Sequence, residues 1–192
     1  MGGQVYGKAA DPRRKEMMIK KILPIVLLLS IVCAGCGYST RSLLPGNLRS
    51  IYIEPFKNGI IYTTENSRTI YLPLLEVKAR NAIVDRYLFD GNLDIGQAGS
   101  SDLLLKGELN GFERDALRYT ENNDVLEYRI RVIVSLVLWD TAQQKILWEE
   151  PGFTGETSYF PTGSQAKSEN TAIEDALLDL ARRVVARTVE DW

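Results

Sequence analysis

Two cysteines, Cys33 and Cys36, are the side chains whose type and spacing most directly suggest chemistry. Their C-x-x-C spacing occurs in redox-active dithiols and in one half of a zinc site. A redox pair normally follows a strand and opens a helix, where the thiolate is stabilised. This pair instead follows Lys20, Lys21 and an apolar run of 11 residues at 22–32, which is the layout of a secretory signal. The run is too short to cross a bilayer, because a membrane-spanning helix needs about 20 residues.

The stretch CAGC is typical of a bacterial lipobox. The small residues Ala34 and Gly35 fit a signal peptidase, and Cys36 is then the residue that receives the lipid. Cleavage before Cys36 discards Cys33, so we expect no disulfide, metal site or redox pair. The expected covalent groups are a diacylglycerol and an N-acyl chain on Cys36, and no cofactor is expected.

This interpretation divides the start of the chain into two parts. Residues 1–35 are predicted to be an n-region and lipoprotein signal peptide, and residues 36–47 a lipidated tether. An uncleaved anchor with chance cysteines is the alternative. The polar residues at the beginning also leave the start codon open between Met1, Met17 and Met18.

Charge and composition exclude several classes of function. The net charge is −2, but residues 36–192 hold 17 basic and 23 acidic residues. A body this acidic does not bind nucleic acid through a broad basic face. The chain has no histidine, and so lacks the usual general base near neutral pH and the commonest zinc ligand. We therefore expect no enzyme, although one that uses only carboxylates or a serine–lysine pair remains an alternative.

The elements that would carry a binding site begin after the tether. Residues 48–56 alternate between apolar and polar side chains and predict a strand, which is followed by a polar loop at residues 57–71. Residues 72–90 predict a helix, and a short strand is expected at residues 93–95. The apolar stripe of the predicted helix consists of Leu72, Leu75, Ala79, Ile83 and Tyr87.

Three longer stretches predict the main strands, at residues 101–112, 124–140 and 146–160. The last two are separated by the turn TAQQK and predict a long antiparallel hairpin. Within residues 124–140 the even positions are apolar from Leu126 through Leu138, and Glu127, Arg129 and Arg131 lie opposite them. The even face is therefore expected to pack against the helices.

The odd face of the same strand becomes apolar at Ile133, Val137 and Trp139. Two explanations fit this change. Either a loop or neighbouring strand covers this part of the sheet, or the sheet presents an apolar patch for a partner.

A second helix is predicted in TAIEDALLDLARRVVARTV, with Thr171 and Glu174 spaced as a capping box. Its last turns carry Arg182, Arg183 and Arg187, which suit the negative end of the helix dipole. The order of elements predicts an α/β (α+β) two-layer sandwich. Two helices would pack on one face of a mostly antiparallel sheet of about four strands, in a single domain over residues 48–192.

The sequence also resembles the LptE family of lipopolysaccharide-assembly lipoproteins of Gram-negative bacteria. The resemblance lies in CAGCGY, in IYIEPFKN, in the block that contains LKGEL, LEYRI and ILWEE, and in the last helix. It implies a protein that inserts into the outer-membrane β-barrel LptD as plug and folding partner and that binds lipopolysaccharide. It also implies an outer-membrane location on the periplasmic side, which Gly37 favours because no aspartate follows the lipidated cysteine.

The resemblance further implies that a few basic residues near the loops at one end of the sheet contact the lipid A head group. By position in the motifs these are Lys167 in SQAKSEN and Arg118 in ERDALRYTENN, with Arg114 as the competitor of Arg118. A tethered lipoprotein that serves as a binding subunit of another secretion or cell-wall complex is the alternative function.

Overall fold

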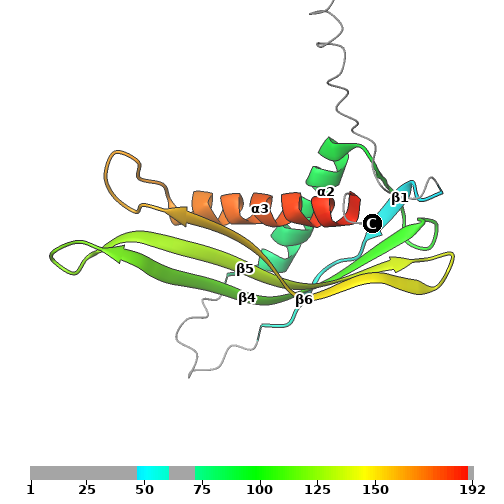
Figure 1. Cartoon of the computed structure of the whole chain (residues 1–192), viewed down its shortest axis with the longest axis horizontal. Coiled ribbons are helices and arrows are strands. Elements are labelled where there is room, and N and C mark those ends of the chain that lie inside the picture. Colours follow the sequence, from blue (N-terminus) through cyan, green and yellow to red (C-terminus); the bar gives the residue numbers. More distant parts are fainter. Residues whose placement is uncertain (1–46, 61–71, 190–192) are drawn as a thin grey trace, which may run out of the picture. The chain divides into compact units, whose positions relative to one another are not determined.

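Three long strands form the centre of the fold, and two helices pack against them (Figure 1). The structure, a computed structural model, describes residues 47–60 and 72–189. Strands β4 (Leu103–Tyr119), β5 (Val125–Asp140) and β6 (Lys145–Tyr159) follow one another as two antiparallel hairpins. All of the described residues belong to one of the chain's two units, Ser42–Trp192.

Short strands extend the sheet on the other side of β4. Strands β1 (Ser50–Ile53) and β2 (Lys57–Asn58) lie parallel to β4, and β3 (Asp94–Ile95) lies parallel to β1. The sheet therefore has six strands in the order β3-β1-β4-β5-β6, with β2 also beside β4. The prediction of about four, mostly antiparallel strands is wrong in number and in the direction of the short strands. Helix α2 explains the β1–β3 pairing, because parallel neighbours need a crossover connection.

Helix α2 (Leu75–Asp90) confirms the helix predicted over residues 72–90. It begins after Leu74, whose backbone is left-handed with φ 59°, and it ends at Gly91, whose N–H donates to the Tyr87 carbonyl at 3.0 Å. Its buried side chains come from the predicted stripe and are Leu75, Ala79, Ile83 and Tyr87.

A buried hydrogen bond joins the two helices. The Tyr87 hydroxyl donates to Thr188 Oγ1 at 2.7 Å, and Thr188 Oγ1 donates to the Val184 carbonyl at 2.9 Å. Burial raises the pKa of the Tyr87 hydroxyl well above its usual range. The phenol therefore stays neutral at neutral pH and acts as a fixed link between α2 and α3.

Helix α3 (Glu169–Val189) confirms the predicted second helix but begins earlier than the predicted capping box. Ser168 is the capping residue, because its Oγ accepts the backbone N–H of Thr171 at 3.1 Å. Thr171 is thus the third residue of the helix. The predicted capping box of Thr171 and Glu174 is therefore wrong, because both residues lie inside the helix.

Helix α3 lies closely against β6, and Gly155 makes that approach feasible. A Cβ atom at Gly155 would collide with the Ala176 carbonyl oxygen and would lie 2.6 Å from the Leu180 backbone nitrogen. Both of these are backbone atoms and cannot rotate away. The absence of a side chain at Gly155 therefore sets the distance between helix and sheet.

The predicted facing of β5 is confirmed from Ile130 to Leu138. The even residues of this stretch are buried in the single hydrophobic core that both helices also enter, so the helices cover the same face of the sheet. These buried residues are Ile130, Val132, Val134, Leu136 and Leu138. The α+β two-layer arrangement is thus confirmed. At the start of β5 the predicted facing is wrong, because Leu126 is exposed and Glu127 is buried. Within residues 47–60 and 72–189, no helix is long and apolar enough to span a membrane.

The register changes near the middle of the sheet. The β4–β5 pairing shifts between Leu109 and Gly111, and the β5–β6 pairing shifts between Val134 and Leu136. A polar ladder on the outer face bridges the irregularity. Ser135 Oγ donates to the Pro151 carbonyl at 2.8 Å, and Asn110 Nδ2 donates to the same carbonyl at 3.2 Å.

Several sequence predictions lie outside the described residues. These are the signal peptide at residues 1–35, the tether up to residue 46, and residues 61–71 of the predicted loop. They remain predictions.

Candidate functional site

The two loops that carry the predicted lipopolysaccharide contacts lie at the same end of the sheet (Figure 1). One is the β4–β5 hairpin tip, and the other is the connection from β6 to α3. Arg118 lies near the end of β4, and Lys167 lies just before the capping residue of α3. The fold therefore brings both predicted residues to one end of the domain, which we call the hairpin end.

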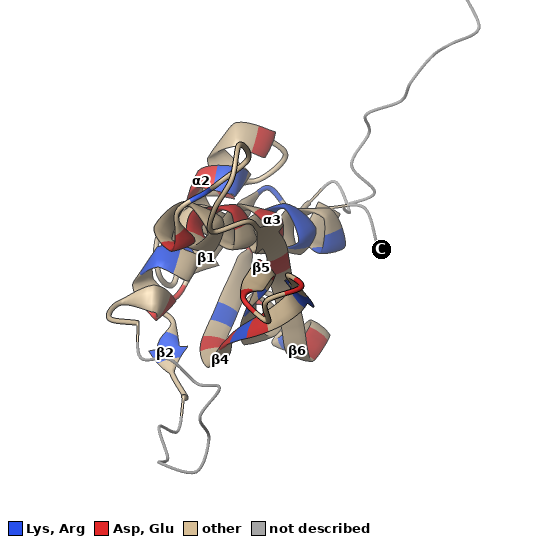
Figure 2. Cartoon of the chain, turned by 90° about the vertical axis from the view of Figure 1, so that its left-hand side faces the viewer, with Lys and Arg blue, Asp and Glu red and all other residues tan. Residues whose placement is uncertain are grey.

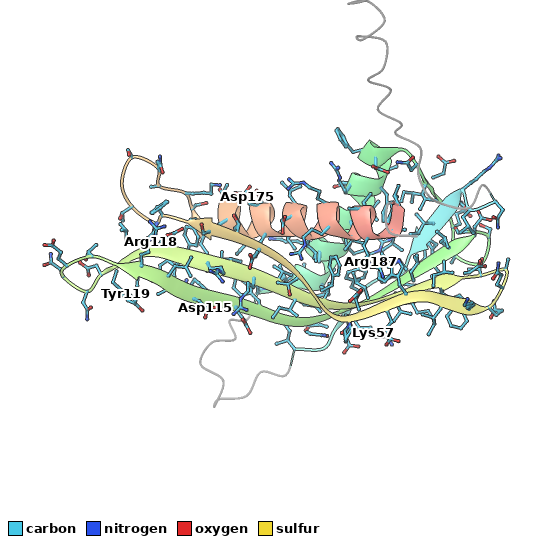
Figure 3. All side chains as sticks on the ribbon, in the orientation of Figure 1. Lys57, Asp115, Arg118, Tyr119, Asp175 and Arg187 are labelled. Atoms are coloured by element: carbon cyan, nitrogen blue, oxygen red, sulfur yellow. The ribbon has the colours of Figure 1, made fainter. Side chains whose placement is uncertain are left out.

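Lys167 is held on the helix side of the hairpin end. Its backbone N–H donates to the Phe160 carbonyl at 2.9 Å, which fixes the chain between β6 and α3. Its side-chain ammonium forms an ion pair with Asp175 on α3. Figure 3 shows Asp175 on the part of α3 that is nearest the hairpin end. An anionic ligand at Lys167 must therefore compete with this carboxylate.

Arg118 is paired across the hairpin. Its Nε lies 2.9 Å from Glu127 Oε2, and the Arg118 side chain is 67% exposed whereas that of Glu127 is only 9% exposed. A carboxylate this deeply buried needs a cation close to it. Arg118 therefore serves the stability of the hairpin as well as offering an exposed guanidinium.

Arg114, the competitor, is the most enclosed of the three cations. Its Nη1 lies 2.6 Å from Glu169 Oε2, and its guanidinium lies 5.2 Å from the Tyr128 ring centre. The ring of Tyr128 stacks on Tyr159 at 5.7 Å. Partial burial lowers the pKa of Arg114, but Glu169 more than reverses this, so the net shift is upward. This cluster fastens the start of α3 to the sheet.

The hairpin end is therefore balanced in charge and is not a basic patch. Figure 2 looks onto this end and shows basic and acidic residues interspersed. On the outer face, Arg131 Nη2 contacts both Glu113, at 2.5 Å, and Asp115, at 2.8 Å. The pairing of Arg114 with Glu169 could not be found in the sequence, because the two residues are separated by 55 positions.

Two arginines in the second half of α3, Arg183 and Arg187, have structural contacts with β6. Arg183 donates to the Thr154 carbonyl at 2.6 Å, and its guanidinium lies 5.6 Å from the Phe153 ring centre. Arg187 pairs with Glu150 at 3.4 Å. These side chains hold α3 against the edge strand, which makes them weaker candidates for ligand binding.

The outer face of the sheet offers a second candidate. Ile133, Val137 and Trp139 are only partly buried there, and the Lys106 ammonium lies 5.9 Å from a Trp139 ring centre. Beside them is an open hollow of about 240 Å³, whose lining carries Lys57, Lys106 and three glutamates. Because this lining carries both basic and acidic side chains, the hollow does not favour a ligand of either charge. Within the described part of the chain, no histidine, cysteine, aspartate and glutamate side chains are grouped so that they could hold a metal ion.

Comparison with known protein families shows to which family the chain belongs. The sequence model of a family described as LptE, lipopolysaccharide-assembly, matches residues 48–188, which is well over half of the chain. The chain belongs to the LptE family. This membership confirms the resemblance seen in the sequence motifs, and the match covers every described strand and both described helices apart from the last residue of α3.

A solved structure supports the fold of this LptE family member. Protein XCC0632 from Xanthomonas campestris is similar with a TM-score of 0.53 and 13% identity, over 75% of this chain and 85% of that chain. Rare lipoprotein B from Shewanella oneidensis is similar over 71% of this chain and 92% of that chain, with 11% identity. Its TM-score of 0.44 is too low to carry an argument. None of the curated protein sequences compared with this chain matches it.

Proposed function

We propose that this LptE family member is a non-enzymatic lipoprotein of the outer membrane that acts in lipopolysaccharide assembly. In this proposal it faces the periplasm and is anchored by the lipid on Cys36. It partners the LptD β-barrel as plug and folding factor, and it binds lipopolysaccharide during assembly at the outer leaflet. The observation that carries the proposal is the family match over residues 48–188.

The proposed anchor rests on the sequence around Cys36. An apolar run of 11 residues, two small residues and then a cysteine is the pattern of a processed lipoprotein. Burying acyl chains contributes about 0.8 kcal/mol per methylene group, and more than one chain is needed for stable attachment. Diacylglycerol together with an N-acyl chain meets that requirement.

The proposed lipopolysaccharide contact is Lys167, assisted by Arg118. Lipid A carries phosphates, and a charge-assisted hydrogen bond from an ammonium or guanidinium is the usual protein contact for such a group. The common position of the two cations at the hairpin end supports this pairing. The carboxylates of Glu127 and Asp175 limit the strength of this lipopolysaccharide contact, because each phosphate must displace or share an existing ion pair.

Capture of the partner from solubilised outer membranes tests the main proposal. The chain carries a C-terminal affinity tag, and a very large β-barrel protein is expected to copurify with it. The matched control is a tagged fusion in which residues 1–47 anchor an unrelated soluble domain. If the chain and the control capture the same proteins, or if the chain captures a secretion or cell-wall complex instead, the LptD partnership is wrong.

A further inference from the structure

The last turn of α2 exposes two adjacent large apolar side chains. Leu88 is 63% exposed and Phe89 is 80% exposed, the highest value among the large apolar residues that the structure describes. Arg86 lies beside them, with its guanidinium 5.1 Å from the Phe89 ring centre. Scattered single apolar residues are normal on a protein surface, whereas an adjacent pair with a cation is typical of a contact site.

This patch lies next to the place where the chain enters the domain. Four residues after α2 ends, Asp94 pairs with Ser50 at the start of β1, and the Asp94 N–H donates to the Arg49 carbonyl at 2.8 Å. Leu93 is buried between these segments. The end of α2 is thus fixed close to the start of β1, and β1 begins three residues after the first described residue, Asn47.

The tether limits how far this entry point can lie from the membrane. Cys36 precedes Asn47 by 11 residues. A fully extended chain of that length spans at most about 40 Å. With Cys36 acylated, this entry point would lie within that distance of the lipid surface.

We propose that Leu88 and Phe89 insert into the phospholipid surface beside the Cys36 anchor, with Arg86 pairing with a lipid phosphate. This inference rests on the proposed acylation of Cys36. An aromatic ring and an aliphatic side chain next to an arginine suit the boundary between acyl chains and head groups. The Arg86 Nε is buried and has no hydrogen-bond partner among the described residues.

The pattern along α2 favours a membrane over a protein groove. A partner that takes a helix in a groove contacts a continuous apolar stripe. On α2 the exposed apolar residue Val77 is separated from Leu88 by the exposed polar residues Asn81 and Asp85. The apolar contact is therefore confined to the end of the helix, as insertion of a helix end into a lipid surface requires.

Site-specific fluorescence of the full-length acylated chain tests the proposal. A Phe89→Cys variant, made with Cys33→Ser, is labelled with an environment-sensitive dye and reconstituted into vesicles of phosphatidylethanolamine and phosphatidylglycerol. Matched controls carry the label at Val77→Cys, on the same helix, and at Leu178→Cys, which is 56% exposed on α3. We expect a blue-shifted emission at position 89 and quenching by brominated acyl chains several-fold stronger there than at either control.

Two outcomes overturn the inference, and a third measurement separates it from the proposed anchor. Equal, solvent-like emission at all three positions means that the helix end stays in water. Blue-shifted emission at both position 77 and position 89, without quenching by brominated lipid, means that a protein covers the helix. The mass of the Cys36 peptide reports acylation directly, so an acylated chain with a solvent-exposed position 89 contradicts this inference alone. An unacylated Cys36 contradicts the anchor and this inference together.

Discussion

At the scale of single residues, the ion pair between Lys167 and Asp175 determines what a lipopolysaccharide contact can contribute. We expect Lys167→Glu to weaken binding by about 1–3 kcal/mol, the range for a hydrogen bond to a charged group. The loss has two causes, because the cation disappears and the new carboxylate faces both Asp175 and the lipid phosphate. Lipopolysaccharide titration of the detergent-solubilised chain at low salt measures the effect, and circular dichroism checks the fold.

A matched control for this variant is Lys145→Glu, which makes the same charge change at the start of β6, beside the opposite end of β5. It should bind lipopolysaccharide like the parent chain. If Lys167→Glu and the double variant Arg118→Glu, Lys167→Glu both bind like the parent, the contact lies elsewhere. Arg114 is then the next residue to test.

Asp102 provides a pH-dependent prediction at the same scale. Its Oδ2 accepts the backbone N–H groups of Arg49 and Ser50, both at 3.0 Å, and the Ser50 hydroxyl at 2.8 Å. The Arg49 backbone hydrogen bond, followed by that of the Ser50 side chain, holds the pKa of Asp102 below its usual value. A lowered pKa stabilises the fold above the unfolded pKa of about 3.9, and this contribution is lost as pH falls through the folded value.

We therefore expect Asp102→Asn to lower the free energy of unfolding at neutral pH by about 1 kcal/mol. The difference from the parent chain should shrink as pH falls from about 4 through the lowered folded pKa of Asp102, because the carboxylate is then protonated in the folded state as well. Urea unfolding at several pH values measures this. A difference that stays constant from neutral to acid pH would show that the carboxylate charge contributes nothing.

At the scale of elements, Gly155 controls how α3 packs on β6. We expect Gly155→Ala to lower the free energy of unfolding by about 1–3 kcal/mol, the usual cost of overpacking. The added methyl group meets the backbone of α3 at Ala176 and Leu180, so the helix must move away from the sheet. Denaturant unfolding measures the loss.

Gly152→Ala is the matched control, because it lies in the same strand and a Cβ there meets nothing within 4 Å. It should change stability by only a few tenths of a kcal/mol. Equal losses for the two variants would mean that the cost comes from the strand backbone and not from contact with α3.

At the scale of the whole molecule, the anchor decides where the domain works. We expect Cys36→Ser to release the protein from the membrane or to leave it unprocessed, since the thioether that carries the lipid cannot form. Cys33→Ser should be nearly silent, because cleavage before Cys36 removes that residue. Membrane fractionation and labelling with a radioactive fatty acid measure both variants. Unchanged lipid labelling of Cys36→Ser would show that the acylation site is wrong.

The sequence by itself determined the long elements and the family. A helix or a long strand with one buried face repeats its pattern every 3.6 or 2 residues, so a local stretch is enough to identify it. That is why the buried stripe of α2 and the buried even residues of β5 were predicted correctly. Family membership was also predicted correctly, because the motifs are short local stretches that occur in a fixed order along the chain.

Only the tertiary structure decided which distant segments meet. The strand β2 has only two residues, too few to show a period, and the parallel pairing of β1 with β3 depends on where α2 returns the chain. The partner of Arg114 at the hairpin end is likewise non-local, since Arg114 meets Glu169 only because α3 folds back over the sheet. Local periodicity carries no information about such contacts, because they depend on the path of the whole chain.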